Sequence, residues 1–270
     1  MDAWQILLPA FLFCCLMILT HSYLGLHVLA RGIIFIDLAL AQIAALGVSV
    51  AFLLGEEAHG SAAKLYALAA TLLASFAFAA LRKVPGKVNR EVIIGCVYVV
   101  TMALSIVILS RSSQGMEELK SLFNGNILWV SWEEIAQVSI VYALLALFHF
   151  KYGRRFHDLS FNDEDGQGRN FLWEFLFFGS FSVVITLAVN LAGVLLVFAF
   201  LIIPAFSASL LAVRFGTRLF IAWLLGIVAT MLGLVSAYVA DLPVGATLVV
   251  LTGLLPLAAL FLITVKKKFA

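Results

Sequence analysis

Residues 171–213 read FLWEFLFFGSFSVVITLAVNLAGVLLVFAFLIIPAFSASLLAV, and this stretch decides the fold class. A helix needs about 20 consecutive apolar residues to cross the hydrocarbon core of a bilayer. The stretch has the length for two such crossings, and only Asn190 and Gly193 interrupt its middle. It therefore predicts two membrane-spanning helices joined by a sharp turn or, as the alternative, one span with an irregular or re-entrant piece.

The composition extends this interpretation to the whole chain. Of the 270 residues, 64% are hydrophobic and 12% are charged, and the mean hydropathy is +1.11. Soluble domains have about 25% charged residues. Because no water-soluble fold of this length could bury so much apolar surface, most of it must face lipid. We expect an all-α fold, a polytopic transmembrane helix bundle, with residues 1–270 as a single domain.

The same length criterion yields nine candidate spans. Treating the stretch on either side of residues 190–193 as one span gives eight as the alternative. The nine candidates are residues 5–29, 33–54, 61–81, 92–110, 134–150, 172–190, 193–213, 219–240 and 244–264.

Lys and Arg are distributed unevenly between the loops that nine spans create. Cytoplasmic loops carry an excess of these residues. Only Lys64, Arg111 and Lys120 fall on the less basic side. The distribution predicts that the N-terminus lies outside and the C-terminus inside. The basic side holds Arg31, Arg82, Lys83, Lys87, Arg90, Lys151, Arg154, Arg155, Arg169, Arg214, Arg218, Lys266, Lys267 and Lys268.

Two connecting segments are long enough to have roles of their own. The outer segment, residues 111–133, places Phe123, Trp129 and Trp132 among polar residues. Tryptophan favours the membrane–water interface, so we expect this segment to lie along the membrane surface. The inner segment, residues 151–173, reads KYGRRFHDLSFNDEDGQGRNFLW and is the longest and most polar cytoplasmic stretch.

The chain lacks the sequence motifs of an ATPase, a metalloprotease and a serine hydrolase. Residues 55–60, GEEAHG, begin like a phosphate-binding loop, but Ser61 and Ala62 follow where Lys and Ser or Thr are required. No HExxH or GxSxG motif is present. ATP hydrolysis, if it powers this protein, must therefore take place in a separate subunit.

Histidine gives little support for a metal site. His21 and His27 are six residues apart, so they face different sides of one helix. We expect His59, His149 and His157 at or near surface loops.

Asp37 is the only acidic residue well inside a predicted span, about 6 Å from its inner end at 1.5 Å per residue. Gln42 follows in the same span. An ionisable group in lipid costs several kcal/mol, which makes it a functional candidate by default. The alternative is a structural acid that is bonded to a neighbouring helix or hydrated near the surface.

Four stretches together resemble the permease subunits of the zinc/manganese/iron ABC importer family. Residues 193–211, GVLLVFAFLIIPAFSASLL, and residues 241–247, DLPVGAT, are the more specific matches. Residues 122–134, LFNGNILWVSWEE, and residues 35–47, FIDLALAQIAALG, are moderate ones. The matches run from about residue 25 to residue 264, so the resemblance covers nearly the whole chain.

These stretches also have a physical interpretation. Pro204 removes a backbone donor in mid-helix, and Gly193 and Gly245 are further positions for a kink or close packing. Asp241 suits the start of a helix, where a carboxylate caps free N–H groups. Contact with a passing ion is the alternative role of Asp241.

The resemblance implies a transporter of several subunits in a bacterial cytoplasmic (inner) membrane. Its partners would be a cytoplasmic ATP-binding subunit, an extracytoplasmic metal-binding protein and a second permease subunit, identical or paralogous, with no nucleic acid. The cargo would be a divalent zinc, manganese or iron ion, and no cofactor would be bound permanently.

The resemblance also assigns candidate residues by region. The implied metal pathway includes Asp37, Gln42 and Asp241, and the implied outer docking loop includes Phe123, Trp129 and Trp132. The implied ATPase-coupling residues are Phe156, Ser160, Phe161, Asp163 and Trp173.

The chain departs from the family pattern in two places. The family has a histidine four residues after its aspartate, whereas this chain has Ala41 there and Gln42 next. After Phe161 the inner segment is acidic and a poor helix former. A permease for iron chelates or cobalamin, and a self-contained secondary transporter, remain the alternatives.

Overall fold

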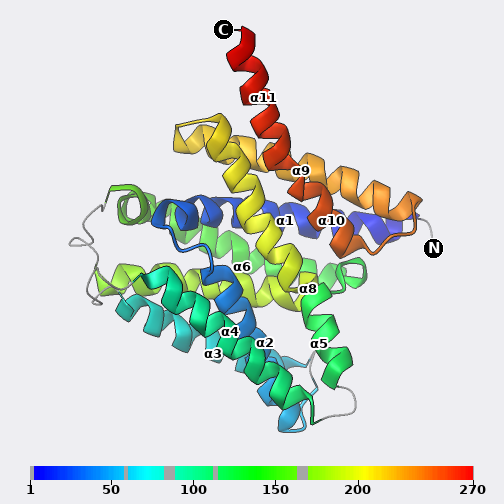
Figure 1. The fold of residues 1–270 in the computed structure, drawn as a ribbon. Coiled ribbons are helices and arrows are strands. Elements are labelled where there is room, and N and C mark those ends of the chain that lie inside the picture. The colour runs from blue at the N-terminus through cyan, green and yellow to red at the C-terminus, as the bar shows by residue number, and fades with distance from the viewer. Residues whose placement is uncertain (1–2, 58–59, 82–88, 112–114, 163–169, 270) are drawn as a thin grey trace. The chain divides into compact units, whose positions relative to one another are not determined.

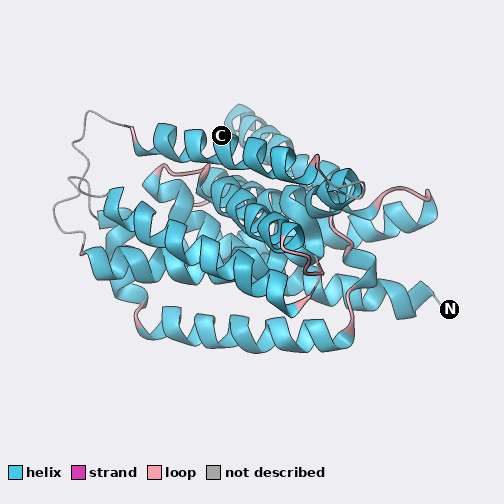
Figure 2. Cartoon of the chain, turned by 90° about the horizontal axis from the view of Figure 1, so that it is seen from below, coloured by secondary structure: helices cyan, strands magenta, loops and turns pink. Residues whose placement is uncertain are grey.

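The computed structural model describes residues 3–57, 60–81, 89–111, 115–162 and 170–269. Every regular element in these ranges is a helix, as Figure 2 shows. The elements are α1 (Ala3–Arg31), α2 (Ile36–Leu53), α3 (Ser61–Ala80), α4 (Arg90–Leu109), α5 (Gly115–Asn124), η2 (Ile127–Trp129), α6 (Trp132–Lys151), α7 (Gly153–His157), η3 (Asp158–Asn162), α8 (Phe171–Leu211), α9 (Phe215–Val239), α10 (Val244–Gly253) and α11 (Leu255–Phe269).

Eight helical segments of the described chain are long and apolar enough to cross a membrane. The predicted all-α, multi-span fold class is therefore confirmed. Helices α10 and α11 together form one of these segments, Val244–Val265, which matches the predicted span 244–264. Which side of the membrane each terminus faces stays a prediction.

Helix α8 answers the question raised by residues 190–193. It has 41 residues, which at 1.5 Å per residue is about 60 Å, twice the thickness of the hydrocarbon core. Gly193 lies inside it with φ 77° and ψ 160°, which is not helical. The helices of both predicted spans are thus present, and the interruption between them is a single residue.

The chain forms two compact units. Unit 1 consists of Met1–Leu29, Asn126–Ala143 and Leu195–Ala270, and unit 2 consists of Ala30–Gly125 and Leu144–Val194. Whether the whole chain acts as a single domain stays a prediction.

Unit 2 is built around α2, which packs against α3 and α4 (Figure 1). A Cβ on Gly47 would lie 2.7 Å from Ala67 Cα, so the backbones of α2 and α3 are in direct contact. Hydroxyl groups join α3 to the first half of α8: Thr71 and Thr186 are 3.0 Å apart, and Ser75 donates to the Phe178 carbonyl at 2.9 Å. Small residues and paired hydroxyls are typical of contacts between membrane helices.

Unit 1 packs α1 against the second half of α8 and against α9. A Cβ on Gly25 would lie 2.0 Å from the Leu201 carbonyl oxygen, and Trp223 Nε1 donates to the Leu19 carbonyl at 3.0 Å. Pro204 is buried in that half of α8, whose backbone stays helical around it.

Candidate functional site

Asp37 is completely buried in the first turn of α2. Within the part of the chain that the structure describes, neither carboxylate oxygen of Asp37 has a hydrogen-bond partner. Helix α2 begins at Ile36, later than the predicted span, because the chain turns at Gly32, whose φ is 64°. Asp37 therefore lies at the end of its helix and not several residues inside it, which corrects the predicted depth.

The other two candidates for the ion pathway lie in different settings. Gln42 is 1% exposed, and its Nε2 has no partner among the described residues. Five residues turn a helix by about 140° from Asp37, so Asp37 and Gln42 do not face the same side. Asp241 is exposed, with a φ of 51°. Helix α10 begins at Val244, with Pro243 at its N-cap and no side-chain cap, so the capping role predicted for Asp241 is wrong.

No preformed metal centre is visible among the described residues. No group of three or more His, Cys, Asp or Glu side chains there is arranged to hold an ion. His21 is a buried group of α1 whose Nδ1 lies 2.9 Å from the Met17 carbonyl oxygen, while Nε2 has no partner in the described ranges.

The inner segment is held to its own unit by an aromatic cluster. Phe156 of α7 is completely buried, and its ring stacks on His149 with centroids 4.3 Å apart and planes 19° apart. Trp173 lies 5.7 Å from the Phe156 ring, edge to face. His149 lies in the last turn of α6, near the loop as predicted, but its ring is 7% exposed and its Nε2 lies 2.8 Å from Ser180 Oγ.

Arg31, the last residue of α1, makes the second attachment of the inner segment. Its Nε donates to Ser160 Oγ at 2.9 Å, and its Nη1 donates to Glu174 Oε2 at 2.9 Å. The guanidinium carbon lies 3.9 Å from the centroid of the Phe177 ring. The sequence does not show that Arg31 and Glu174 are partners, because 143 residues separate them.

These contacts decide which inner-segment residues remain available to a partner. Phe156 and Ser160 face inward, whereas Arg154, Arg155 and Asp158 are exposed. Phe161 is half-buried and stacks on His157 at 4.7 Å, and Asp163 lies outside the described residues. A protein that docks on this segment would meet the exposed charged residues first.

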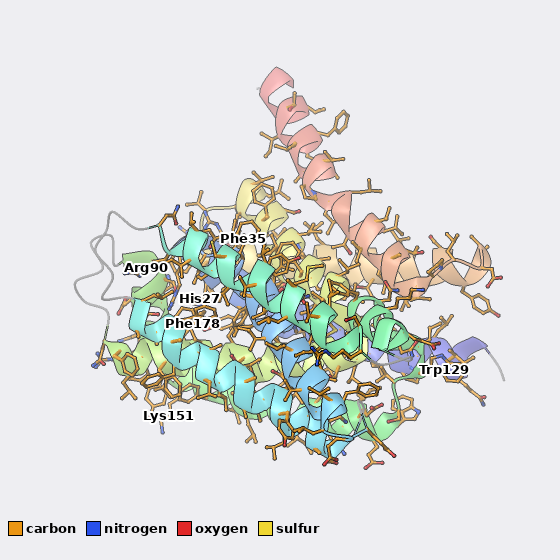
Figure 3. All side chains as sticks on the ribbon, turned by 60° about the horizontal axis from the view of Figure 1, so that its bottom comes forward. His27, Phe35, Arg90, Trp129, Lys151 and Phe178 are labelled. Atoms are coloured by element: carbon orange, nitrogen blue, oxygen red, sulfur yellow. The ribbon has the colours of Figure 1, made fainter. Side chains whose placement is uncertain are left out.

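A cavity of about 220 Å³ lies beside Arg31 within unit 2. Its charged lining consists of Arg31, Arg90, Glu91 and Glu174, and Phe178 is among its apolar lining residues. Glu91 Oε1 accepts a hydrogen bond from the Phe35 N–H at 2.8 Å, which ties the start of α4 to the turn before α2. Figure 3 labels Arg90 and Phe178, which line the cavity, and Phe35, whose N–H donates to Glu91.

The outer segment contains α5 and η2. Trp129 and Trp132 are 81% and 57% exposed, and Phe123 is half-buried. Their position at the membrane surface stays a prediction. Figure 3 shows the Trp129 side chain at the surface. The end of α5 packs at Gly125 against the break in α8 at Gly193. Gly245 is half-buried in the first turn of α10.

Two named relatives are similar to this chain over most of its length. The manganese transport system membrane protein MntC of Listeria monocytogenes is 27% identical over 235 residues, which cover 86% of this chain and 81% of MntC. A "probable iron transport system membrane protein" of Haemophilus influenzae is 28% identical over 242 residues, covering 88% of this chain and 83% of the relative.

A solved structure and a family model agree with these relatives. PsaBC from Streptococcus pneumoniae, solved in complex with Fab, shares the fold with a TM-score of 0.76 at 21% identity, over 96% of this chain and 93% of that one. The model of the ABC 3 transport family matches residues 3–263. Because that match spans nearly the whole sequence, the chain belongs to the ABC 3 transport family.

Proposed function

We propose that this chain is the permease subunit of an ABC importer and that its cargo is a divalent zinc, manganese or iron ion. The family match over residues 3–263 carries the proposal. The names of the manganese and iron relatives support a metal cargo. The eight apolar helical segments among the described residues give the chain the means to cross a bacterial cytoplasmic membrane several times.

The chain needs partners to work in this way. It has no phosphate-binding loop, so a cytoplasmic ATP-binding subunit supplies the energy. A second permease subunit, identical or paralogous, completes the translocation path. An extracytoplasmic metal-binding protein delivers the ion to the outer segment, where Trp129 and Trp132 are exposed.

The mechanism that we propose is alternating access. Closure of the ATP-binding subunits moves the permease helices and changes which side of the membrane the path faces. We assign the transmission of this movement to the inner segment, the longest stretch on the side that the distribution of Lys and Arg predicts to be cytoplasmic.

Asp37 is our first candidate for contact with the moving ion. Both of its oxygens are buried and lack a partner among the described residues, and an unpaired buried charge costs several kcal/mol. A divalent cation offsets that cost as it passes, since carboxylate oxygen binds manganese, iron and zinc. Gln42 and Asp241 are further candidates on the path.

Reconstitution tests the function. The chain is purified in complex with its ATP-binding subunit and its second permease subunit, placed in lipid vesicles and supplied with the metal-loaded binding protein. We expect ATP-dependent accumulation of radioactive zinc, manganese or iron. Uptake driven by an ion gradient without the ATP-binding subunit would indicate a secondary transporter. Transport of cobalamin or an iron chelate in place of the bare ion would indicate the related permease class.

A further inference from the structure

We propose that Arg31 is a positioning residue that fixes the inner segment to the first turn of α8, so that helix movement reaches the ATP-binding subunit. The inference rests on the proposed function, because it concerns how that importer couples its two parts. Arg31 ends α1, a continuous helix from Ala3, and it contacts residues of η3 and α8 at once.

The guanidinium group has the shape that this task requires. Nε and Nη1 point to two acceptors on different elements, Ser160 Oγ and Glu174 Oε2, each 2.9 Å away. The Phe177 ring, 3.9 Å from the guanidinium carbon, supports one face of the group. A planar, multi-donor group on an aromatic face fixes two partners in one geometry, which a lysine ammonium cannot do in the same way.

The ion pair between Arg31 and Glu174 is buried. The side chains of Arg31 and Glu174 are 2% and 4% exposed, so salt in the cytoplasm screens their attraction little. A buried ion pair often adds no net stability compared with apolar residues of similar size. Its best-attested use is to select one arrangement of the elements that carry it.

Ser160 is the inward end of a short segment that is fixed at two points. Phe156 is held by its stack on His149, and Ser160 is held by Arg31. Arg154, Arg155 and Asp158, which lie around and between these attachments, are exposed. Release of Ser160 would remove one of these two attachments and allow the exposed groups to move relative to α8.

Two variants of the complete reconstituted transporter test the role. Ser160→Ala removes the bond to the inner segment and leaves the ion pair intact. Arg31→Met combined with Glu174→Met removes the pair without leaving a buried charge. The matched control is Ser139→Ala, because Ser139 Oγ donates only within α6, to the Ile135 carbonyl.

The measurement is the amount of metal transported per ATP hydrolysed, normalised to assembled complex. We expect both variants to assemble and to transport about fivefold less metal per ATP, the factor that loss of one hydrogen bond typically makes in an equilibrium. A merely structural role would lower the amount of complex and leave this ratio unchanged. The control should match the unmodified protein.

The outcomes separate this inference from the proposed function. If the unmodified complex shows no ATP-dependent metal uptake, the proposed function fails. If it transports metal and Ser160→Ala keeps the normal ratio, the positioning role of Arg31 is overturned while the function stands. If the double variant fails to assemble, the result with Ser160→Ala alone decides.

Discussion

Gly125 and Gly193 lie back to back, so that each occupies the space a side chain on the other would need. A Cβ on Gly193 would lie 2.4 Å from the Gly125 nitrogen, and a Cβ on Gly125 would lie 2.1 Å from the Ala192 carbonyl carbon. Both residues have positive φ, 66° and 77°. The end of the outer segment is therefore in direct backbone contact with the break in α8, and only glycine fits at either position.

The first prediction concerns this pair. Gly125→Ala or Gly193→Ala should lower the free energy of unfolding by about 1–3 kcal/mol from backbone strain, with a further loss from the displaced backbone. The melting temperature in detergent measures the effect. Gly216→Ala is the control, since a Cβ there has open space and its φ is not positive. Equal melting temperatures for Gly193→Ala and the control would contradict the prediction.

Asp37→Asn should impair transport more than folding. The substitution keeps the size and one acceptor oxygen but removes the charge that a divalent cation would meet. We expect normal insertion and assembly, with metal uptake per assembled complex reduced at least about tenfold, as for loss of other groups that support metal binding. Glu56→Gln, at an exposed position, is the control. Normal uptake per complex would remove Asp37 from the pathway.

Trp129→Ala and Trp132→Ala should weaken binding of the extracytoplasmic metal-binding protein. Both side chains are largely exposed, so their removal should change thermal stability little. If they contact that protein, its affinity for the vesicle-embedded transporter should fall about tenfold, as for a central interface aromatic. Leu73→Ala, which also removes an exposed apolar side chain, should have no effect. Unchanged affinity would favour anchoring at the membrane surface alone.

Crosslinking should identify which inner-segment residues face the ATP-binding subunit. Arg155→Cys and Asp158→Cys, both exposed, should form crosslinks with that subunit when the native Cys14, Cys15 and Cys96 are replaced by serine. Ser160→Cys should crosslink poorly, since the Ser160 side chain faces Arg31. Efficient crosslinking from Ser160→Cys with none from Asp158→Cys would contradict this prediction, because it would show that Ser160 and not Asp158 faces the ATP-binding subunit.

The sequence by itself determined the fold class. The length of an apolar run and the spacing of charges depend only on the order of residues, and membrane spans follow from them. The interruption at Asn190 and Gly193 was also visible in the sequence. The conformation of this interruption was not visible in the sequence. Gly193 has a φ of 77° and is in close contact with Gly125, which is far away in the chain.

The functional candidates also show what the sequence determined and what only the tertiary structure decided. The sequence singled out Asp37, since an acid in an apolar span is conspicuous. Only the tertiary structure placed it in the first turn of α2 and left its oxygens without a described partner. His149 lies near the loop, as expected, but its position near the end of an apolar span says nothing about the Phe156 ring that covers it.

Arg31 shows most clearly what only the tertiary structure decided. In the sequence it is one of several basic residues at the ends of spans, and that role predicts orientation alone. Its contacts with Ser160 and Glu174 join positions 129 and 143 residues away. Such contacts depend on which helix faces pack together, and packing is set by the fit of many side chains at once rather than by any local pattern.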